Sequence, residues 1–259
     1  MSMKMSAASC CSQCSGVLDS IVHYVQYKLR IFKEPPPKTL ELRYFDIPGK
    51  GAPIRQVAAY IGAEFTDHRY KTREEFLVED KPKLKFGQVP LLKAGFGPIN
   101  IDMVQTTAIM RYLARAYGRK DLYPDGARGQ IVDSLCDFEV DFALGESAIK
   151  YGERNGIILD EEATKKSIDA YVQVIKQKLE LLDKCIANKP PMSEKDSPWL
   201  AGTKLPTIAD FLWGCRLRGT ASSLNTWGKS SEVDLSKFPN VKRFFDAYSS
   251  IPIVKKWSN

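Results

Sequence analysis

Histidine is scarce in this chain of 259 residues, which contains only His23 and His68. So small a supply argues against a His-based catalytic triad, a two-His metal centre or a Cys/His zinc site in the body of the chain. The Cys-x-x-Cys pair at Cys11 and Cys14 has no second pair to complete a zinc site. We therefore expect no metal ion in this protein.

The sequence also lacks the evenly distributed cysteines of a disulfide framework. Three cysteines cluster near the N-terminus and the others are scattered. The full set is Cys10, Cys11, Cys14, Cys136, Cys185 and Cys215. This pattern favours a reducing compartment, so we expect a cytoplasmic protein.

A basic stripe interleaved with aromatic residues is missing as well, although the net charge is +7. The 38 basic and 31 acidic residues are interspersed, so we expect no nucleic-acid partner. A moderately positive protein suits small anionic ligands or an anionic membrane surface. The contents of 44% hydrophobic and 27% charged residues are ordinary for a globular protein of one or two domains.

The chain divides into three segments. Residues 1–38 end in a Glu-Pro-Pro-Pro-Lys run, which predicts a stiff extended connector. Residues 39–119 mix strand and helix patterns, with a charged loop expected after the second strand. Strands are predicted at residues 40–44, 64–70 and 89–92, and helices at residues 54–61 and 106–117.

Residues 126–259 show no strand pattern. Apolar residues at helical spacing predict helices over residues 131–142, 168–186 and 241–248. Thr207 and Asp210 have the spacing of a capping box and predict the start of another buried helix. The sequence therefore predicts an α/β domain followed by an all-helical domain.

Tyr44 ends the first predicted strand, just before a loop that contains Gly49 and Gly51. The following helix has Pro53 in its first turn, so the segment is a competent strand-to-helix turn. A hydroxyl group at the end of the strand would project toward the edge of the sheet. On periodicity alone, a core or rim aromatic residue is the alternative interpretation of Tyr44.

Two further motifs favour a binding site. Pro90 belongs at the start of a strand, and a cis peptide there would turn the preceding backbone toward an extended peptide ligand. Gln105 and Thr106 open the most regular predicted helix of this domain. The exposed N–H groups and the dipole of such a helix terminus attract an anion.

These motifs together resemble those of cytosolic glutathione transferases, most closely the tyrosine-type sigma class that includes glutathione-dependent prostaglandin D synthases. The resemblance covers residues 39–258. The matching runs are YFDIPGKGAPIR at residues 44–55, FTDHR at 65–69, GQVP at 87–90, QTTAIMRYL at 105–113 and TIADF at 207–211.

The resemblance implies a thioredoxin-like N-terminal domain, an α-helical C-terminal domain and a homodimer with a glutathione site on each subunit. Tyr44 takes the catalytic role, because a hydroxyl donor aimed at the sulfur of glutathione favours the nucleophilic thiolate. The residues implied to bind glutathione are Phe45, Lys50, Phe76, Lys81, Gln88, Val89, Pro90, Gln105, Thr106 and Asp137.

The resemblance implies that the backbone of Val89 pairs with the cysteinyl part of glutathione. It also implies that Gln105 and Thr106 hold the γ-glutamyl carboxylate. A simple helix cap is the alternative for this pair. Gln88 and Lys81 serve the middle of the ligand and its glycyl carboxylate, although Lys81 also fits a solvated loop.

The acid at Asp137 matches one that reaches the γ-glutamyl amine in the partner subunit, with a solvated helix face as its alternative. Lys50 and Phe76 replace the arginine and tryptophan of many sigma-class relatives, so we expect modest glutathione affinity. By the same resemblance, Asp133 and Asp137 match two acids of a cluster that some prostaglandin synthases use to bind a divalent cation. Cys136 replaces a third acid, so we expect no metal activation.

The predicted function is that of a transferase that conjugates glutathione to hydrophobic electrophiles. A glutathione-dependent isomerase or peroxidase acting on lipids is the alternative within the family, and a noncatalytic carrier or structural protein is the third possibility. We expect the electrophile pocket in the helical domain, with Phe142 among its residues.

The N-terminal segment lies outside the resemblance. Apolar residues at helical spacing over residues 18–32 predict an amphipathic helix that is too polar to span a membrane. The helix follows Cys10, Cys11 and Cys14, where palmitoylation would add an anchor. Peripheral membrane contact through residues 1–33 is therefore a hypothesis, and its alternative is a helix packed on the protein's own surface.

Overall fold

The structure is a computed structural model and describes residues 36–84, 86–190 and 192–257. Every helix and strand named below lies in the second of two compact units, Pro37–Asn259. The predicted N-terminal helix and the cluster of Cys10, Cys11 and Cys14 lie outside the described residues. Membrane association through residues 1–33 therefore stays a prediction.

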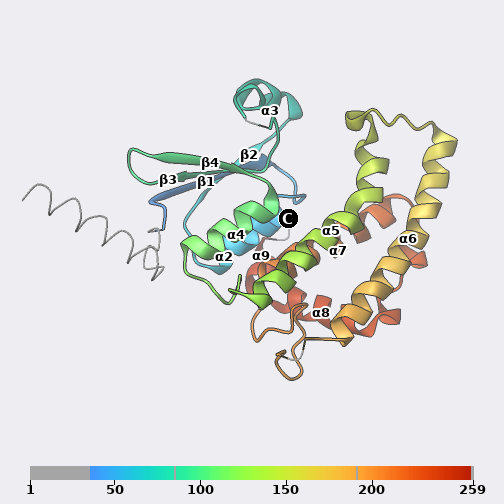
Figure 1. The fold of residues 1–259 in the computed structure, drawn as a ribbon. Helices are drawn as coiled ribbons and strands as arrows, with labels where there is room; N and C mark the ends of the chain where they lie inside the picture. Colours follow the sequence, from blue (N-terminus) through green and yellow to red (C-terminus); the bar gives the residue numbers. More distant parts are fainter. Residues whose placement is uncertain (1–35, 85, 191, 258–259) are drawn as a thin grey trace, which may run out of the picture. The chain divides into compact units, whose positions relative to one another are not determined.

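A four-stranded sheet forms the first half of this unit, with the strand order β2-β1-β3-β4. Strand β1 is parallel to β2 and antiparallel to β3, and β4 pairs antiparallel with β3 (Figure 1). Alternate residues of β1, Leu40, Leu42 and Tyr44, are buried. The strands are β1 (Thr39–Phe45), β2 (Thr66–Tyr70), β3 (Leu91–Gly95) and β4 (Asn100–Val104).

Helices cover the two faces of the sheet unequally. Helices α2 (Ala52–Tyr60) and α4 (Thr106–Ala116) lie side by side on one face, and α3 (Arg73–Glu79) lies on the other (Figure 1). The sequence predicted a charged loop after β2, and this was wrong because the structure has helix α3 there. The Thr72 hydroxyl caps the start of α3 by accepting a hydrogen bond from the Glu75 N–H group. A 3₁₀ turn, η1 (Lys81–Lys83), follows α3.

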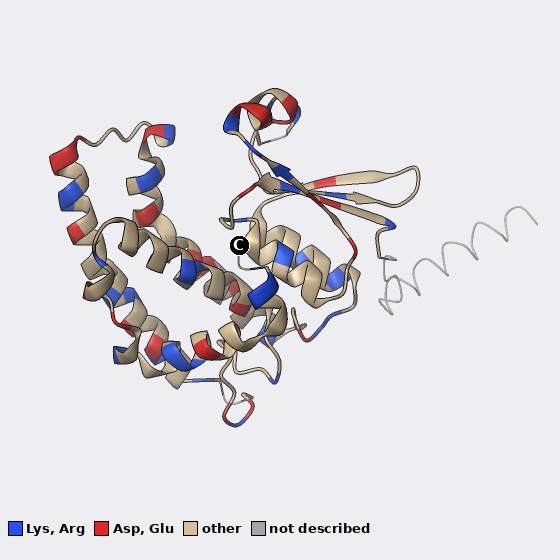
Figure 2. Ribbon diagram, turned by 180° about the vertical axis from the view of Figure 1, so that it is seen from behind, with Lys and Arg blue, Asp and Glu red and all other residues tan. Residues whose placement is uncertain are grey.

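The second half contains only helices in the part that the structure describes, which confirms the predicted fold class. Its α-helices are α5 (Ala127–Tyr151), α6 (Glu161–Ala187), α7 (Ile208–Thr226), α8 (Pro239–Ser250) and α9 (Pro252–Lys256). Its 3₁₀ turns are η2 (Gly152–Asn155), η3 (Ser230–Glu232) and η4 (Leu235–Lys237). Basic and acidic residues are interspersed along these elements (Figure 2). None of the described helices has the length and apolar content needed to cross a membrane.

Helix α7 joins the two halves, since it packs against α2, α4, α5 and α8. The Phe211 ring lies 5.2 Å from that of Tyr60 on α2. The Tyr248 hydroxyl donates to Gln56 Oε1, also on α2, at 2.9 Å. These buried contacts hold the strand-to-helix segment after β1 against the helical half of the protein.

The predicted capping box at the start of α7 is confirmed. Asp210 is fully buried, and one of its carboxylate oxygens accepts hydrogen bonds from the N–H and hydroxyl groups of Thr207, at 2.6 and 2.8 Å. The other oxygen accepts from the Leu200 N–H group at 2.8 Å. Burial raises the pKa of Asp210 to about 6, against the donated hydrogen bonds, which favour the ionised form.

We expect Asp210→Ala to lower the free energy of unfolding by about 2–5 kcal/mol, because it leaves the N–H groups of Thr207 and Leu200 buried without acceptors. Asp210→Asn, which keeps one acceptor oxygen, should cost less. Urea denaturation would measure both values. An alanine variant as stable as the wild type would show that this cap contributes nothing to folding.

Candidate active site

Tyr44 is held by the loop that follows strand β1. Its side chain is only 8% exposed, and its hydroxyl oxygen accepts a hydrogen bond from the Lys50 N–H group at 3.1 Å. A Cβ atom at Gly49 would lie 2.6 Å from this oxygen, and one at Gly51 would lie 2.6 Å from the Tyr44 ring. Because Gly49 also has φ near +39°, glycine is required there for both space and backbone conformation.

The Lys50 residue connects this loop to helix α4. Its carbonyl oxygen accepts a hydrogen bond from the Thr106 hydroxyl at 3.2 Å, whereas its side chain is exposed. The N–H group and the carbonyl of one loop residue therefore tie Tyr44 to the start of α4. The structure thus brings together Tyr44, Lys50 and Thr106.

The Tyr44 hydroxyl is a hydrogen-bond donor at neutral pH. Burial raises the pKa of Tyr44, and the hydrogen bond from Lys50 only partly opposes this effect. Since the Lys50 N–H group is itself a donor, it occupies a lone pair of the oxygen and leaves the hydroxyl hydrogen for another acceptor. The site can therefore stabilise a negatively charged ligand atom.

Gln105 lies at the N-terminus of α4 in an unusual backbone conformation, with φ 76° and ψ 118°. Such a conformation costs about 1–3 kcal/mol in a residue other than glycine and is typical of binding sites. The Gln105 side chain does not cap the helix but donates a hydrogen bond to Gln88 Oε1 at 3.3 Å. The first N–H groups of α4 thus keep their capacity to bind an anion.

The segment before β3 lies beside these glutamines. The Val89–Pro90 peptide bond is cis, Pro90 is buried, and Val89 forms no backbone hydrogen bond with another described residue. The main chain of Val89 is therefore open to an extended ligand. The exposed Lys81 side chain reaches the same segment, since its Cε atom lies 3.8 Å from the position of a Cβ atom on Gly87.

Phe45 and Phe76 lie in an aromatic cluster next to Tyr44. The ring centroid of Phe45 is 5.5 Å from that of Tyr44 and 5.5 Å from that of Phe76. Tyr70 packs against both phenylalanines, and Phe76 is only 7% exposed. These rings support the end of β1 and the start of α3.

Asp137 lies apart from this group, on the exposed surface of helix α5. The structure places it in contact with none of the other described site residues. Phe142, expected in the electrophile pocket, is fully buried and packs against Trp213 with ring centroids 5.2 Å apart. That expectation was wrong, because Phe142 belongs to the helical core.

Sequence reasoning missed the contribution of Arg55, which is 1% exposed. Its Nε atom donates to both carboxylate oxygens of Asp67 on β2, at 2.9 and 3.1 Å. Its two terminal nitrogens donate to the carbonyl groups of Ile47 and Phe45, at 3.0 and 3.3 Å. Arg55 is the only charged residue of α2, and this is the signal that could have identified it.

Comparison with known proteins identifies relatives of this chain. Residues 40–115 match the family model "Glutathione S-transferase, N-terminal domain", and residues 156–259 match "Glutathione S-transferase, C-terminal domain". Glutathione S-transferase 1 of Ascaris suum is 31% identical over 219 residues, which cover 84% of this chain and 94% of the relative. Hematopoietic prostaglandin D synthase of Gallus gallus is 27% identical over 221 residues, with the same coverage of each chain.

Among solved structures, a glutathione S-transferase of the hookworm Necator americanus, described as monomeric, has the same fold. The TM-score is 0.64 at 23% identity, and the match covers 85% of this chain and 96% of that one.

We expect Arg55→Lys to lower the free energy of unfolding by about 2–4 kcal/mol, because lysine cannot reproduce the planar fork that reaches Asp67 and two carbonyl groups. Thermal and urea denaturation would measure the loss. Arg73→Lys, at an exposed position of α3, is the matched control and should change stability by less than about 0.5 kcal/mol. Equal stability of the two variants would contradict the supporting role of Arg55.

Proposed function

The chain belongs to the glutathione S-transferase family, and we propose that it conjugates the thiolate of glutathione to hydrophobic electrophiles, with Tyr44 as the hydroxyl donor to sulfur. One observation carries this proposal. The Tyr44 oxygen accepts from the Lys50 N–H group, so its own hydrogen is free to stabilise a thiolate. The hydroxyl is buried at a strand end, beside an uncapped helix terminus that suits an anionic peptide.

The Tyr44 hydroxyl would act by shifting the ionisation of the bound thiol. A free thiol has a pKa of about 8.5, so it is mostly protonated at neutral pH. A charge-assisted hydrogen bond of about 1.5–3 kcal/mol lowers this value by roughly one to two units. The thiol proton passes to solvent, the sulfur forms a bond to the electrophilic carbon, and the leaving group departs with its bonding electrons. No general base is required.

Glutathione would lie across the segments that surround Tyr44. The α4 terminus at Gln105 and Thr106 would hold the γ-glutamyl carboxylate, and the free backbone of Val89 would pair with the cysteinyl part. Gln88 would support the middle of the ligand, while the exposed ammonium of Lys81 would bind the glycyl carboxylate.

The electrophile would enter from the side of the helical half. Tyr151 ends α5 and Arg154 lies in η2, and both influence the pKa of Tyr44 electrostatically. Both are exposed, and the Arg154 guanidinium lies 4.6 Å from the centre of the Tyr151 ring. An exposed aromatic surface paired with a cation suits a hydrophobic substrate that carries a polar or anionic group.

An isomerase or peroxidase acting on lipids is the second candidate, because one relative is a prostaglandin D synthase. Both reactions would use the same thiolate. A comparison of turnover with an aryl halide, a lipid hydroperoxide and a prostaglandin endoperoxide would rank the three activities. Retention on immobilised glutathione with no turnover of any substrate would favour a carrier.

We expect Tyr44→Phe to reduce the rate of conjugation by about tenfold to a hundredfold while glutathione binding is nearly retained. The pKa of the bound thiol should rise by about one to two units, so activity should recover as the pH increases. The thiolate absorbance of the complex and the pH profile of kcat/KM would measure both effects. Tyr117→Phe, which removes a hydroxyl outside the site, is the control. An unchanged profile for Tyr44→Phe would rule out its role.

A homodimer is part of the proposal. Val140 and Leu144 are 58% and 67% exposed and lie on the same face of α5 as Asp137, at a spacing of three and four residues. Exposed apolar side chains on one face are typical of a protein interface. Asp137 at this face would reach the glutathione bound to the partner subunit.

We expect a dimer at micromolar concentration in sedimentation velocity, and a shift toward monomer for Leu144→Lys, because the substitution buries an unpaired charge. Asp137→Ala should weaken glutathione binding more than Asp102→Ala, a matched change at an exposed position of β4 outside this face. A fully active monomer would contradict the shared site.

A further inference from the structure

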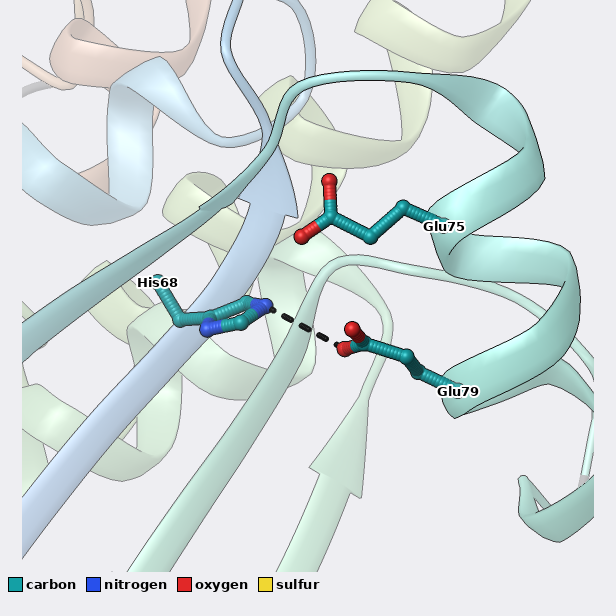
Figure 3. Close-up of side chains that lie close together, drawn as sticks. All are labelled: His68, Glu75 and Glu79. Atoms are coloured by element: carbon teal, nitrogen blue, oxygen red, sulfur yellow. Dashed lines mark ion pairs between the residues drawn. The ribbon is translucent and has the colours of Figure 1, made fainter.

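A second group of polar side chains lies beside Tyr70, the residue that packs against Phe45 and Phe76. His68 extends from strand β2, and Glu75 and Glu79 extend from helix α3 (Figure 3). One ligand atom from each residue can be chosen so that all three lie within 4.8 Å of one another. These are an imidazole nitrogen and two carboxylate oxygens, which are ordinary ligands of divalent metal ions.

The local fold explains why these residues meet. Glu75 and Glu79 are four residues apart and so lie on the same face of α3. Strand β2 is an edge strand, and His68 points toward this face of the helix (Figure 3). Two negative charges at this spacing destabilise a helix, so a cation bound between Glu75 and Glu79 would relieve the repulsion of their carboxylates.

The imidazole of His68 has an unsatisfied nitrogen. Its Nε2 atom is shielded from solvent and has no hydrogen-bond partner among the described residues. Glu79 Oε2 lies 3.8 Å from this atom, which is close enough for an ion pair but too far for a hydrogen bond. The ring is held in place by a T-shaped contact with Tyr70, with centroids 4.9 Å apart. A buried polar atom without a partner indicates a missing ligand.

The carboxylate of Glu75 is held in position for a ligand. Its Oε2 atom accepts a hydrogen bond from the Lys71 N–H group at 2.6 Å, and the Glu75 N–H group donates to the Thr72 hydroxyl at 3.1 Å. A carboxylate fixed in this way can still bind a cation through its other oxygen. The nearby ammonium group of Lys71 pairs with Asp46 at 2.7 Å, so it does not neutralise the cluster.

We propose that His68, Glu75 and Glu79 bind a divalent transition-metal ion, with zinc as the ion that fits their chemistry best. A zinc ion with bonds of about 2.0–2.1 Å holds neighbouring ligand atoms about 3.3 Å apart. The three atoms, which lie within 4.8 Å of one another, would have to close by up to about 1.5 Å. The exposed side chain of Glu79 can make this movement. Three protein ligands leave a fourth position for water.

The scarcity of histidine does not exclude this site. It argues against a centre with two histidines, whereas the cluster uses one histidine and two carboxylates. Magnesium and calcium fit less well, because they prefer six or more oxygen ligands. The bound ion would cross-link α3 to β2 and so fix Phe76, the buried residue of α3, in the aromatic cluster beside Tyr44.

Titration calorimetry with zinc chloride would test this site on the full chain with Cys10, Cys11, Cys14 and Cys185 replaced by serine, which removes the N-terminal cysteine cluster and the exposed thiol of Cys185. We expect one zinc ion per chain and a rise in melting temperature. Glu79→Gln and His68→Phe should each weaken binding by about tenfold or more, since the loss of even a supporting group costs this much. Phenylalanine keeps the ring contact with Tyr70.

Glu74→Gln is the matched control, because it removes the same charge from an exposed position of α3 outside the cluster. Its zinc affinity should stay within about twofold of the parent value. The proposal would be overturned by an absence of saturable binding, by equal losses in Glu74→Gln and Glu79→Gln, or by unchanged affinity in Glu79→Gln. Since Glu79 is exposed, its substitution tests the site even if His68→Phe does not fold.

Discussion

The candidate active site depends on a buried arginine, Arg55. Arg55 uses its whole guanidinium group to join Asp67 on the neighbouring strand to the carbonyl groups of Phe45 and Ile47, where the chain leaves the sheet. Asp67 also accepts a hydrogen bond from Arg69 Nε at 2.7 Å, whereas for the two carbonyl groups Arg55 is the side-chain donor. Arg55 therefore holds the turn that positions Tyr44 through charge and hydrogen bonds.

The groups that the candidate site offers to a ligand are largely main-chain groups. The N–H group of Lys50 orients the Tyr44 hydroxyl, and the strained backbone of Gln105 leaves a helix terminus uncapped. The backbone of Val89 bonds to no other described residue. Such groups are set by the fold and pay little side-chain entropy when a ligand binds. In the proposed mechanism, one side-chain hydroxyl and the geometry around it carry the chemistry.

Periodicity predicted those elements whose buried faces are apolar, including β1, α4 and the long helices. It missed β4, because the side chains of residues 100–104 are mostly exposed and carry little pattern. It also missed α3, which buries only Phe76 and depends on the Thr72 cap. The pairing of Arg55 with Asp67 joins residues on different elements, so no local pattern could reveal it. The motifs around Tyr44 carried the prediction of the site.

The contacts of Lys50 bear on how freely this position can change. Its N–H group serves Tyr44 and its carbonyl serves Thr106, whereas its side chain extends into solvent. Any amino acid except proline, which has no N–H group, supplies the same two main-chain groups. The side chain at position 50 can therefore change without loss of the hydrogen bond that orients the hydroxyl, and a reporter dye attached there would leave both main-chain contacts intact.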